Sequence, residues 1–275
     1  MTGRRLSPAA LPAVMLLAVP VVAAVAGPFL APAITPPDGA PYTIGGGHLL
    51  GTDRTGRDVL GLLLRGGPSA LGVACCAVAF ACLAGGLLGL AAATTRHRWI
   101  DEAMMRPVEL ILPIPSLLII SVVGVGWRGR PEAIAFAVAA INVPAVARLI
   151  RAAALDAAGG PVAEAMRFQG ESRARILLGH VGRSVLPVAA ADAGTRVPYA
   201  VFTVAAANFL GLGLDATSPD WGVTIAASRE ALLIQPWAVC APAAMLVMFT
   251  VGLNLLADRL LGARERPRTT KAAGR

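Results

Sequence analysis

Long uncharged apolar runs are the feature that most restricts how this chain can fold. No Asp, Glu, Lys or Arg occurs in 6–37, 66–95, 110–127 or 231–257. A helix needs about 20 apolar residues to cross the roughly 30 Å hydrocarbon core of a bilayer, where only helices and closed barrels satisfy their own backbone. With 56% hydrophobic and 15% charged residues, the chain is also too apolar for an ordinary soluble domain. The sequence therefore predicts a membrane protein.

Two shorter apolar segments extend the prediction to six transmembrane helices in an all-α membrane protein. The fourth, 133–147, reaches membrane length when Arg148 snorkels to the interface, and the fifth, 184–208, is interrupted by Asp192 and Arg196. The expected organisation is an N-terminal tip and first helix at 1–37, an external loop with an interfacial helix at 38–65, a five-helix core at 66–258 with a cytoplasmic loop at 152–183 and an external loop at 209–235, and a basic cytoplasmic tail at 259–275.

The distribution of basic residues predicts the direction of these spans. With a cytoplasmic N-terminus, 17 of the 24 Lys and Arg residues fall in inside segments and six in outside segments, and Arg196 lies within a span. The positive-inside rule then places both termini in the cytoplasm. The net charge of +8 accordingly reports topology, and we expect no nucleic-acid partner. In an alternative interpretation, Arg4 and Arg5 with 24–26 mark a cleaved signal peptide, which leaves the 38–65 loop outside as well.

The sequence lacks the residue patterns of a catalytic, metal or nucleotide site. The four cysteines lie inside apolar runs without CxxC or Cys/His spacing, so we expect neither disulfides nor a zinc site. No G-x-x-x-x-G-K-[ST] run occurs, and the glycines at 45–47 lack the lysine that follows in a phosphate-binding loop. We therefore predict no catalytic residue, no metal site and no cofactor in this chain.

The predicted cytoplasmic loop 152–183 has a helix, glycine, helix pattern. Pro161 suits the first turn of a helix, Glu164 lies near the positive end of that helix, and Gly170 favours the left-handed conformation that ends it. A second helix is expected to begin near Ser172 and to turn Ile176 toward an apolar neighbour. On these residues alone, an amphipathic surface helix pair is an equally good interpretation.

This loop resembles the EAA loop of ABC importer permeases, whose signature is Glu-Ala-Ala, three residues, then Gly. Glu164, Ala165 and Gly170 match, whereas Met166 replaces the second alanine and 182–183 stand where a first Leu-Pro is expected. Other segments resemble the C-subunit type of dipeptide, oligopeptide and nickel permeases: HLLGTDRTGRDVLGLLLRGGPSALGVA, MMRPVELILPIPSLLII, INVPAVARLIRAAAL, NFLGLGLDATSPDWG and LNLLADRLLGARERPR.

The resemblance implies a type I ABC importer permease in a prokaryotic inner membrane. Its implied partners are a homologous second permease, two cytoplasmic ABC ATPase subunits that hold ATP and magnesium, an extracytoplasmic substrate-binding protein and the lipid bilayer. The residues implied to couple the permease to the ATPase are Glu164, Ala165 and Gly170. Arg167, Arg173 and Arg175 are candidate electrostatic partners in that contact, and a solvated face of positive-inside arginines is the alternative.

Asp192 and Arg196 are the charges that the prediction places inside the membrane. Charges at membrane depth are costly, and these two lie four residues apart on one helical face. They either form a structural ion pair or line the translocation path. The related permeases commonly have Gln near the first position and Glu near Val204, so the chain departs from their polar pattern. We expect a di- or oligopeptide as cargo, with nickel or a metal chelate as the alternative.

The stretch 48–60 is the densest polar cluster between apolar runs. Its resemblance to the family rests on Gly51, Thr52, Asp53, Gly56, Arg57 and Asp58. We interpret Thr55 and Asp58 as a capping pair for an interfacial helix through 59–64, so that the stretch forms an external collar that orients the second span and meets the binding protein. Direct cargo contact, or a catalytic or metal site with His48, is the alternative.

Two other classes of protein are alternatives to a permease subunit. A self-contained secondary transporter would show inverted repeats and several intramembrane charges, and the sequence shows neither. A membrane-bound enzyme would use His48, Asp53 and Asp58 as acid, base or ligands. Both alternatives predict activity from this polypeptide alone, whereas a permease subunit requires ATPase partners.

Overall fold

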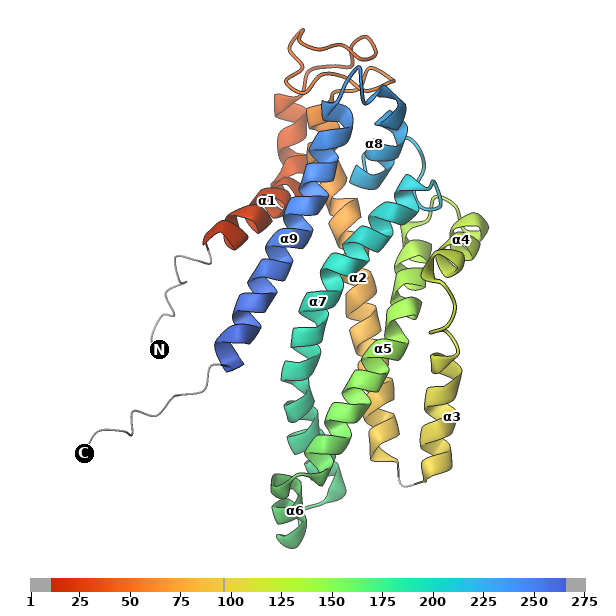
Figure 1. Ribbon diagram of the computed structural model, residues 1–275, viewed down its shortest axis with the longest axis vertical. Coiled ribbons are helices and arrows are strands. Elements are labelled where there is room, and N and C mark those ends of the chain that lie inside the picture. The colour runs from red at the N-terminus through yellow and green to blue at the C-terminus, as the bar shows by residue number, and fades with distance from the viewer. Residues whose placement is uncertain (1–10, 96, 266–275) are drawn as a thin grey trace, which may run out of the picture.

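The computed structural model describes residues 11–95 and 97–265, and within them the chain is helical, with two isolated bridges and no sheet. Figure 1 shows the arrangement of the helices. In chain order they are α1 (Leu11–Ile34), α2 (Val59–Thr94), α3 (Arg98–Glu109), α4 (Ser116–Gly126), α5 (Pro131–Gly159), α6 (Pro161–Phe168), a π-helical segment (Arg175–Val181), α7 (Gly182–Phe209), α8 (Trp221–Ser228), a 3-10 turn (Arg229–Ala231) and α9 (Trp237–Glu265).

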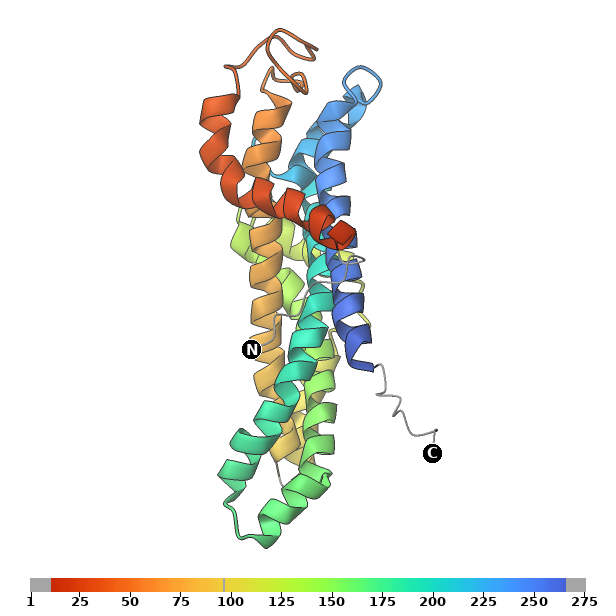
Figure 2. The ribbon, with the colours of Figure 1, turned by 90° about the vertical axis from the view of Figure 1, so that its left-hand side faces the viewer.

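Long helices form a bundle that runs along the long axis of the molecule. Figures 1 and 2 show α2, α5 and α7 lying lengthwise beside one another, with α1 crossing α9. Helices α1, α2, α5 and α9 are long and apolar enough to cross a membrane, and α7 has 28 residues but carries Asp192 and Arg196. The expected all-α membrane architecture is confirmed.

Helices α2 and α5 approach each other closely at two glycines. A Cβ atom on Gly85 would lie 2.8 Å from the Val143 carbonyl oxygen, and one on Gly89 would lie 2.3 Å from the Ala147 carbonyl oxygen. Small residues spaced by four bring helix backbones together in membranes, where van der Waals packing replaces the hydrophobic effect. The glycines therefore set the distance between the two central helices.

The predicted third span, 110–127, is helical only in α4. Pro113 and Pro115 lack the backbone N–H that a continuous helix needs, and the chain between α3 and α4 forms turns instead. The predicted fourth span, 133–147, was too short, because α5 continues to Gly159. Arg151 of α5 pairs with Asp101 of α3, which gives this charge a partner on the neighbouring helix. Residues 152–159, which the prediction assigns to the cytoplasmic loop, thus belong to α5.

The interfacial helix predicted in 38–65 is also wrong. Residues from Val59 onward belong to α2, and Val59, Leu62 and Leu63 are buried between helices rather than turned toward a membrane surface. Asp58 alone caps this helix, since its carboxylate accepts a 2.7 Å hydrogen bond from the Gly61 N–H. Thr55 takes no part in the cap and donates to Asp53.

The predicted external loop 209–235 holds a buried helix, α8. Trp221 at its start is fully buried, and its indole Nε1 donates to the Leu63 carbonyl oxygen of α2 at 2.8 Å. The segment is therefore part of the packed bundle, which corrects the prediction of a simple loop. Helix α9 continues to Glu265, past the predicted start of the tail at 259, and the remainder of the tail and the tip at 1–10 lie outside the described residues.

The α2 to α5 contact is tested with Gly89→Leu. The added side chain must push α5 away, so we expect a loss of about 1–3 kcal/mol in stability. Gly86→Leu is the matched control, because its Cβ meets no atom within 4 Å. Thermal unfolding of both variants in detergent measures the difference, and equal midpoints would contradict the packing role of Gly89.

Candidate functional site

The candidate residues gather at the two ends of the molecule and at one place between them. Figures 1 and 2 show α6 at one end and the 38–58 loop at the opposite end. Asp192 and Arg196 lie between these ends, on α7.

Helix α6 forms as its sequence predicts. Pro161 occupies the first turn, and Glu164 lies in that turn near the positive end of the helix. Gly170 has φ +76°, its N–H donates to the Arg167 carbonyl oxygen, and the Glu171 N–H donates to the Met166 carbonyl oxygen. These two bonds are a Schellman motif, which satisfies the last carbonyl groups of the helix. The prediction for Gly170 is confirmed.

The return arm of this loop leads into α7 without a break. The Ile176 N–H donates to the Ser172 carbonyl oxygen, and Glu171 pairs with Arg175 at 2.7 Å. Ile176 is buried, which confirms its expected apolar contact. A π-helical segment, Arg175–Val181, follows and continues as α7. Helices α5 and α7 therefore enclose a folded connection rather than a flexible one.

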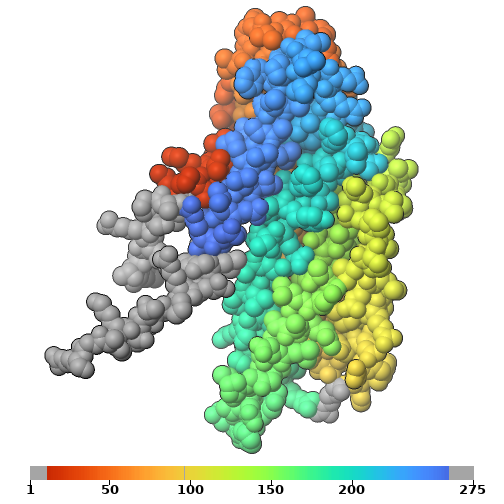
Figure 3. Space-filling view, in the orientation of Figure 1, coloured from red at the N-terminus to blue at the C-terminus, as the bar shows by residue number. Residues whose placement is uncertain are grey.

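One face of α6 is exposed while the other is anchored. Ala163 is fully buried against the bundle, and Figure 3 shows the green residues around α6 as the tip of the molecule. The exposed side chains are those of Glu164, Ala165, Arg167, Arg173 and Arg175, with Val162 and Phe168, and Phe168 is 85% exposed. Sequence reasoning did not single out Val162 or Phe168, which the structure leaves exposed.

The three candidate arginines of this loop have different surroundings. Arg167 donates to the Ala158 carbonyl oxygen at 2.6 Å, and Arg175 pairs with Glu171. Both therefore hold the loop together as well as facing outward. Within the described part of the chain Arg173 has no ion-pair partner. Of the three candidate arginines, Arg173 is thus the one whose charge is not already used within the loop.

Asp192 and Arg196 form the ion pair that their spacing predicts. The Arg196 Nε donates to the Asp192 carboxylate at 2.5 Å, and its Nη1 donates to the Asn142 side-chain oxygen of α5 at 3.2 Å. The Asn142 amide in turn donates to the Val138 carbonyl oxygen. No sequence pattern indicates Asn142 as a partner, since it lies 54 positions from Arg196. That the pair lines a path stays a prediction.

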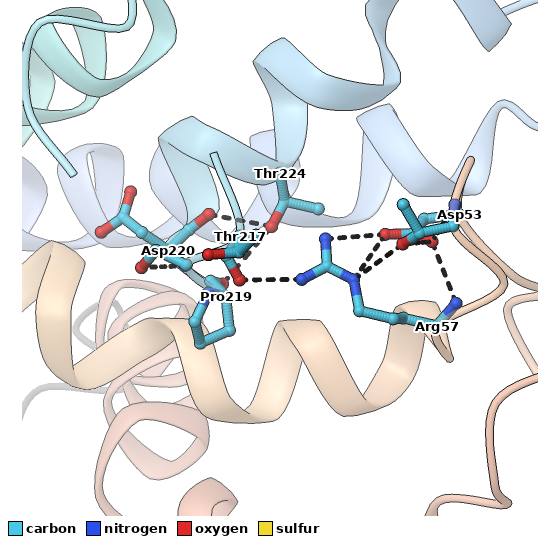
Figure 4. A network of polar contacts seen from close by, with 8 residues as sticks. Asp53, Arg57, Thr217, Pro219, Asp220 and Thr224 are labelled. Carbon is cyan, nitrogen blue, oxygen red and sulfur yellow. Dashed lines mark hydrogen bonds and ion pairs between the residues drawn. The ribbon is translucent and has the colours of Figure 1, made fainter. Parts of the chain in front are cut away.

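Asp53 organises the 38–58 loop as a hydrogen-bond acceptor. Its Oδ1 accepts the Thr55 N–H and hydroxyl, both at 2.7 Å, and its Oδ2 accepts the Arg57 Nε at 2.9 Å. Figure 4 shows Arg57 reaching from Asp53 to the Thr217 carbonyl oxygen. Burial alone would raise the pKa of Asp53, but bonds from Thr55 and Arg57 outweigh it and hold the pKa of this carboxyl below its ordinary value.

The other polar residues of this stretch also have structural partners. The Nδ1 of His48 lies 2.9 Å from Asp58 Oδ1, and both side chains are buried. The Thr52 hydroxyl donates to the Ala40 carbonyl oxygen at 2.7 Å. A Cβ on Gly51 would collide with Gln235, whose amide donates to the Leu50 carbonyl oxygen. His48 and Asp53 therefore do not form one constellation, and the stretch is a folded collar.

A third buried carboxylate, Asp220, was not singled out from the sequence. Its Oδ1 accepts the Gly222 N–H at 2.8 Å as the cap of α8, and its other contacts are Ser69 of α2 and Asn208 of α7. Figure 4 shows it beside Pro219 and Thr224. Burial raises the pKa of the Asp220 carboxyl above its ordinary value, against the bonds from Ser69 and Asn208. Asp220 thus joins three helices at the collar end.

The role of Asp53 predicts a pH-dependent effect of Asp53→Asn. A carboxyl whose folded pKa is lowered stabilises the fold above its unfolded pKa of about 3.9, and this stability is lost as the pH falls through the lower folded value. We therefore expect a lower melting temperature than wild type at pH 7 and a difference that shrinks only below about pH 4. Thermal scans across pH measure it. A difference that is constant down to pH 3 would contradict the role of the charge.

Comparison with known proteins adds a family to this geometry. Residues 85–267, more than half of the chain, match the family described as binding-protein-dependent transport system inner membrane component. The match includes the whole connection from α5 through α6 to α7, and it also includes α8 and α9.

Individual relatives agree with this match. The chain is 32% identical over 217 residues to a dipeptide transport system permease protein, DppC, of Alkalihalophilus pseudofirmus (78% of this chain, 71% of the relative). It is 30% identical over 226 residues to a di/tripeptide transport system permease protein of Pseudomonas aeruginosa (82% and 74%). A glutathione transport system permease protein of Pectobacterium atrosepticum is 29% identical over 217 residues (78% and 71%). The chain therefore belongs to the family of binding-protein-dependent transport system inner membrane components, as a multi-pass permease subunit of an ABC importer.

Proposed function

We propose that this chain forms one half of the translocation pathway for di- or oligopeptides, with a homologous permease as the other half. The relatives described above are permeases for dipeptides, for di- and tripeptides and for glutathione. In α7 this chain departs from the polar pattern of related permeases. Its intramembrane charges, Asp192 and Arg196, pair with each other, and Arg196 also bonds Asn142. The proposal of a peptide as cargo therefore rests on these relatives and not on the shape of a ligand site in this chain.

The observation that carries the proposal is the exposed, rigidly anchored helix α6. A rigid element that is packed on one side and free on the other transmits a rigid-body movement to the helices that hold it. Docking of a cytoplasmic ATPase on Glu164, Ala165 and Phe168 would move α5 and α7 together, with Arg173 supplying charge. ATP and magnesium would be bound by the two ATPase subunits, because this chain carries no phosphate-binding loop.

The proposed orientation follows from the positive-inside rule. It places α6 and both termini in the cytoplasm of a prokaryotic cell and the 38–58 loop on the outer side of the inner membrane. An extracytoplasmic binding protein would then deliver peptide at the collar end. Alternating access would follow from rocking of the helices around a central cavity shared with the second permease.

Reconstitution tests this function directly. The chain is purified with its second permease and ATPase subunits, incorporated into proteoliposomes, and supplied with the binding protein encoded beside it. We expect uptake of a labelled dipeptide only with ATP and every component present, and competition by other dipeptides but not by Ni²⁺. Uptake by this chain alone would refute the proposal in favour of a secondary transporter, and uptake of Ni²⁺ alone would refute the peptide cargo.

The coupling role of α6 is tested separately with Gly170→Val. The Cβ of residue 170 meets nothing within 4 Å, so the variant acts only through its φ of +76°, which costs about 1–2 kcal/mol for a residue other than glycine. We expect at least a fivefold loss of uptake per ATP hydrolysed, or of ATPase docking, with partial rescue in Gly170→Asn. Gly159→Val at an open, ordinary backbone position is the control. Normal uptake in Gly170→Val would remove α6 from the coupling mechanism.

A further inference from the structure

A cavity of about 440 Å³ lies at the collar end and has no role in the function proposed so far. Its walls come from the chain between α7 and α8, from α8 itself and from the turn between α4 and α5. The apolar side chains of Phe209, Leu210 and Val223 line it. Three arginines line it as well, one from each of three separate segments: Arg54, Arg128 and Arg229.

The three arginines are exposed and electrostatically unsatisfied. Among the residues that the structure describes, none of the three has a carboxylate oxygen within 4.0 Å. Arg57 of the same end differs, because Asp53 and the Thr217 carbonyl oxygen occupy its guanidinium. The lining contains one acidic residue, Asp215, so three positive charges face one negative charge around the cavity.

The backbone that carries these arginines is held in place. Arg54 follows Asp53, whose carboxylate is saturated by Thr55 and Arg57. The Gly129 N–H, next to Arg128, donates to the Gly213 carbonyl oxygen at 3.0 Å. Arg229 follows α8, whose first residue Trp221 is fully buried. Hydrogen bonds and packing therefore hold the backbone segments that carry these charges.

A cavity lined by apolar side chains and by exposed arginines fits a protein surface better than a small ion. Protein interfaces combine an apolar centre with a polar rim, and arginine is enriched in them. A site for a free anion would instead bury its charged partners, and here every arginine is open to solvent. Complementary charge at such a rim chiefly steers association and makes it depend on salt.

We propose that the Arg54–Arg128–Arg229 cavity receives an acidic surface segment of the extracytoplasmic binding protein. The proposal rests on the proposed function, which supplies that partner and places this end of the molecule outside. Asp or Glu side chains of the partner pair with the arginine rim, while an apolar side chain of the same segment covers Phe209 and Leu210. The cavity thereby orients the binding protein over the permease before cargo is released.

The test measures affinity of the purified binding protein for the assembled transporter in nanodiscs at several salt concentrations. We expect the triple variant Arg54→Glu, Arg128→Glu, Arg229→Glu to weaken binding at least tenfold at low salt and to flatten the salt dependence. Arg130→Glu is the matched control, because Arg130 is exposed on the same turn but does not line this cavity. Asp215→Asn should act in the opposite sense and tighten binding about two- to threefold.

The outcomes separate this inference from the proposed function. Unchanged affinity in the triple variant, with assembly and basal ATPase activity retained, overturns the cavity as a docking surface and leaves peptide import standing. Unchanged affinity with a raised apparent KM for peptide assigns the arginines to cargo and also overturns it. Absence of import in the wild-type complex under every condition refutes the proposed function, and the inference fails with it. If the triple variant does not assemble, Arg128→Glu against Arg130→Glu decides.

Discussion

The contact between α2 and α5 connects the two ends of the molecule mechanically. Helix α2 begins beside the collar, where Asp58 caps it, and continues for 36 residues along the bundle. Helix α5 belongs to the same bundle, and only Gly160 separates its end from the start of α6. Because Gly85 and Gly89 let the two backbones meet, the helices have little room to shift against each other. In the proposed mechanism, a displacement at α6 would therefore reach the helix that supports the collar.

The collar end is held by carboxylates rather than by apolar packing alone. Asp53 saturates its own turn and positions Arg57 toward the chain before α8, while Asp220 joins α2, α7 and α8. Each unpaired buried charge would be costly, so a satisfied network also fixes a single arrangement of these segments. The surface of the molecule at this end is consequently preformed.

Local chemistry made part of this fold predictable from the sequence. The uncharged runs predicted membrane helices, and Pro161 with Gly170 predicted both ends of α6, because helix caps depend on neighbouring residues. The ion pair of Asp192 and Arg196 followed from a spacing of four. All of these inferences use interactions within one helix or one turn.

The errors arose where distant residues decide the local structure. Pro113 and Pro115 lie in the break between α3 and α4, whereas proline is accommodated inside α2 at Pro68 and inside α5 at Pro144. A sequence pattern does not separate these cases, since the outcome depends on what packs around each proline. In the same way, burial of α8 depends on the bond from Trp221 to Leu63, 158 positions away.

The connection between α5 and α7 has a consequence for how the α6 end transmits force. On the α6 side of the bundle, Ile150 and Ala154 of α5 pack with Val181, the last residue of the π-helical segment, and with Val185 of α7. Farther along, Arg196 of α7 bonds Asn142 of α5. Two separate contacts along the same pair of helices oppose both sliding and rotation of α5 against α7. In the proposed mechanism, α5, α6 and α7 would therefore move as one body when an ATPase pushes on α6. Opening of a pathway would then come from movement of this body against α1, α9 or a partner subunit, because contacts join its own helices.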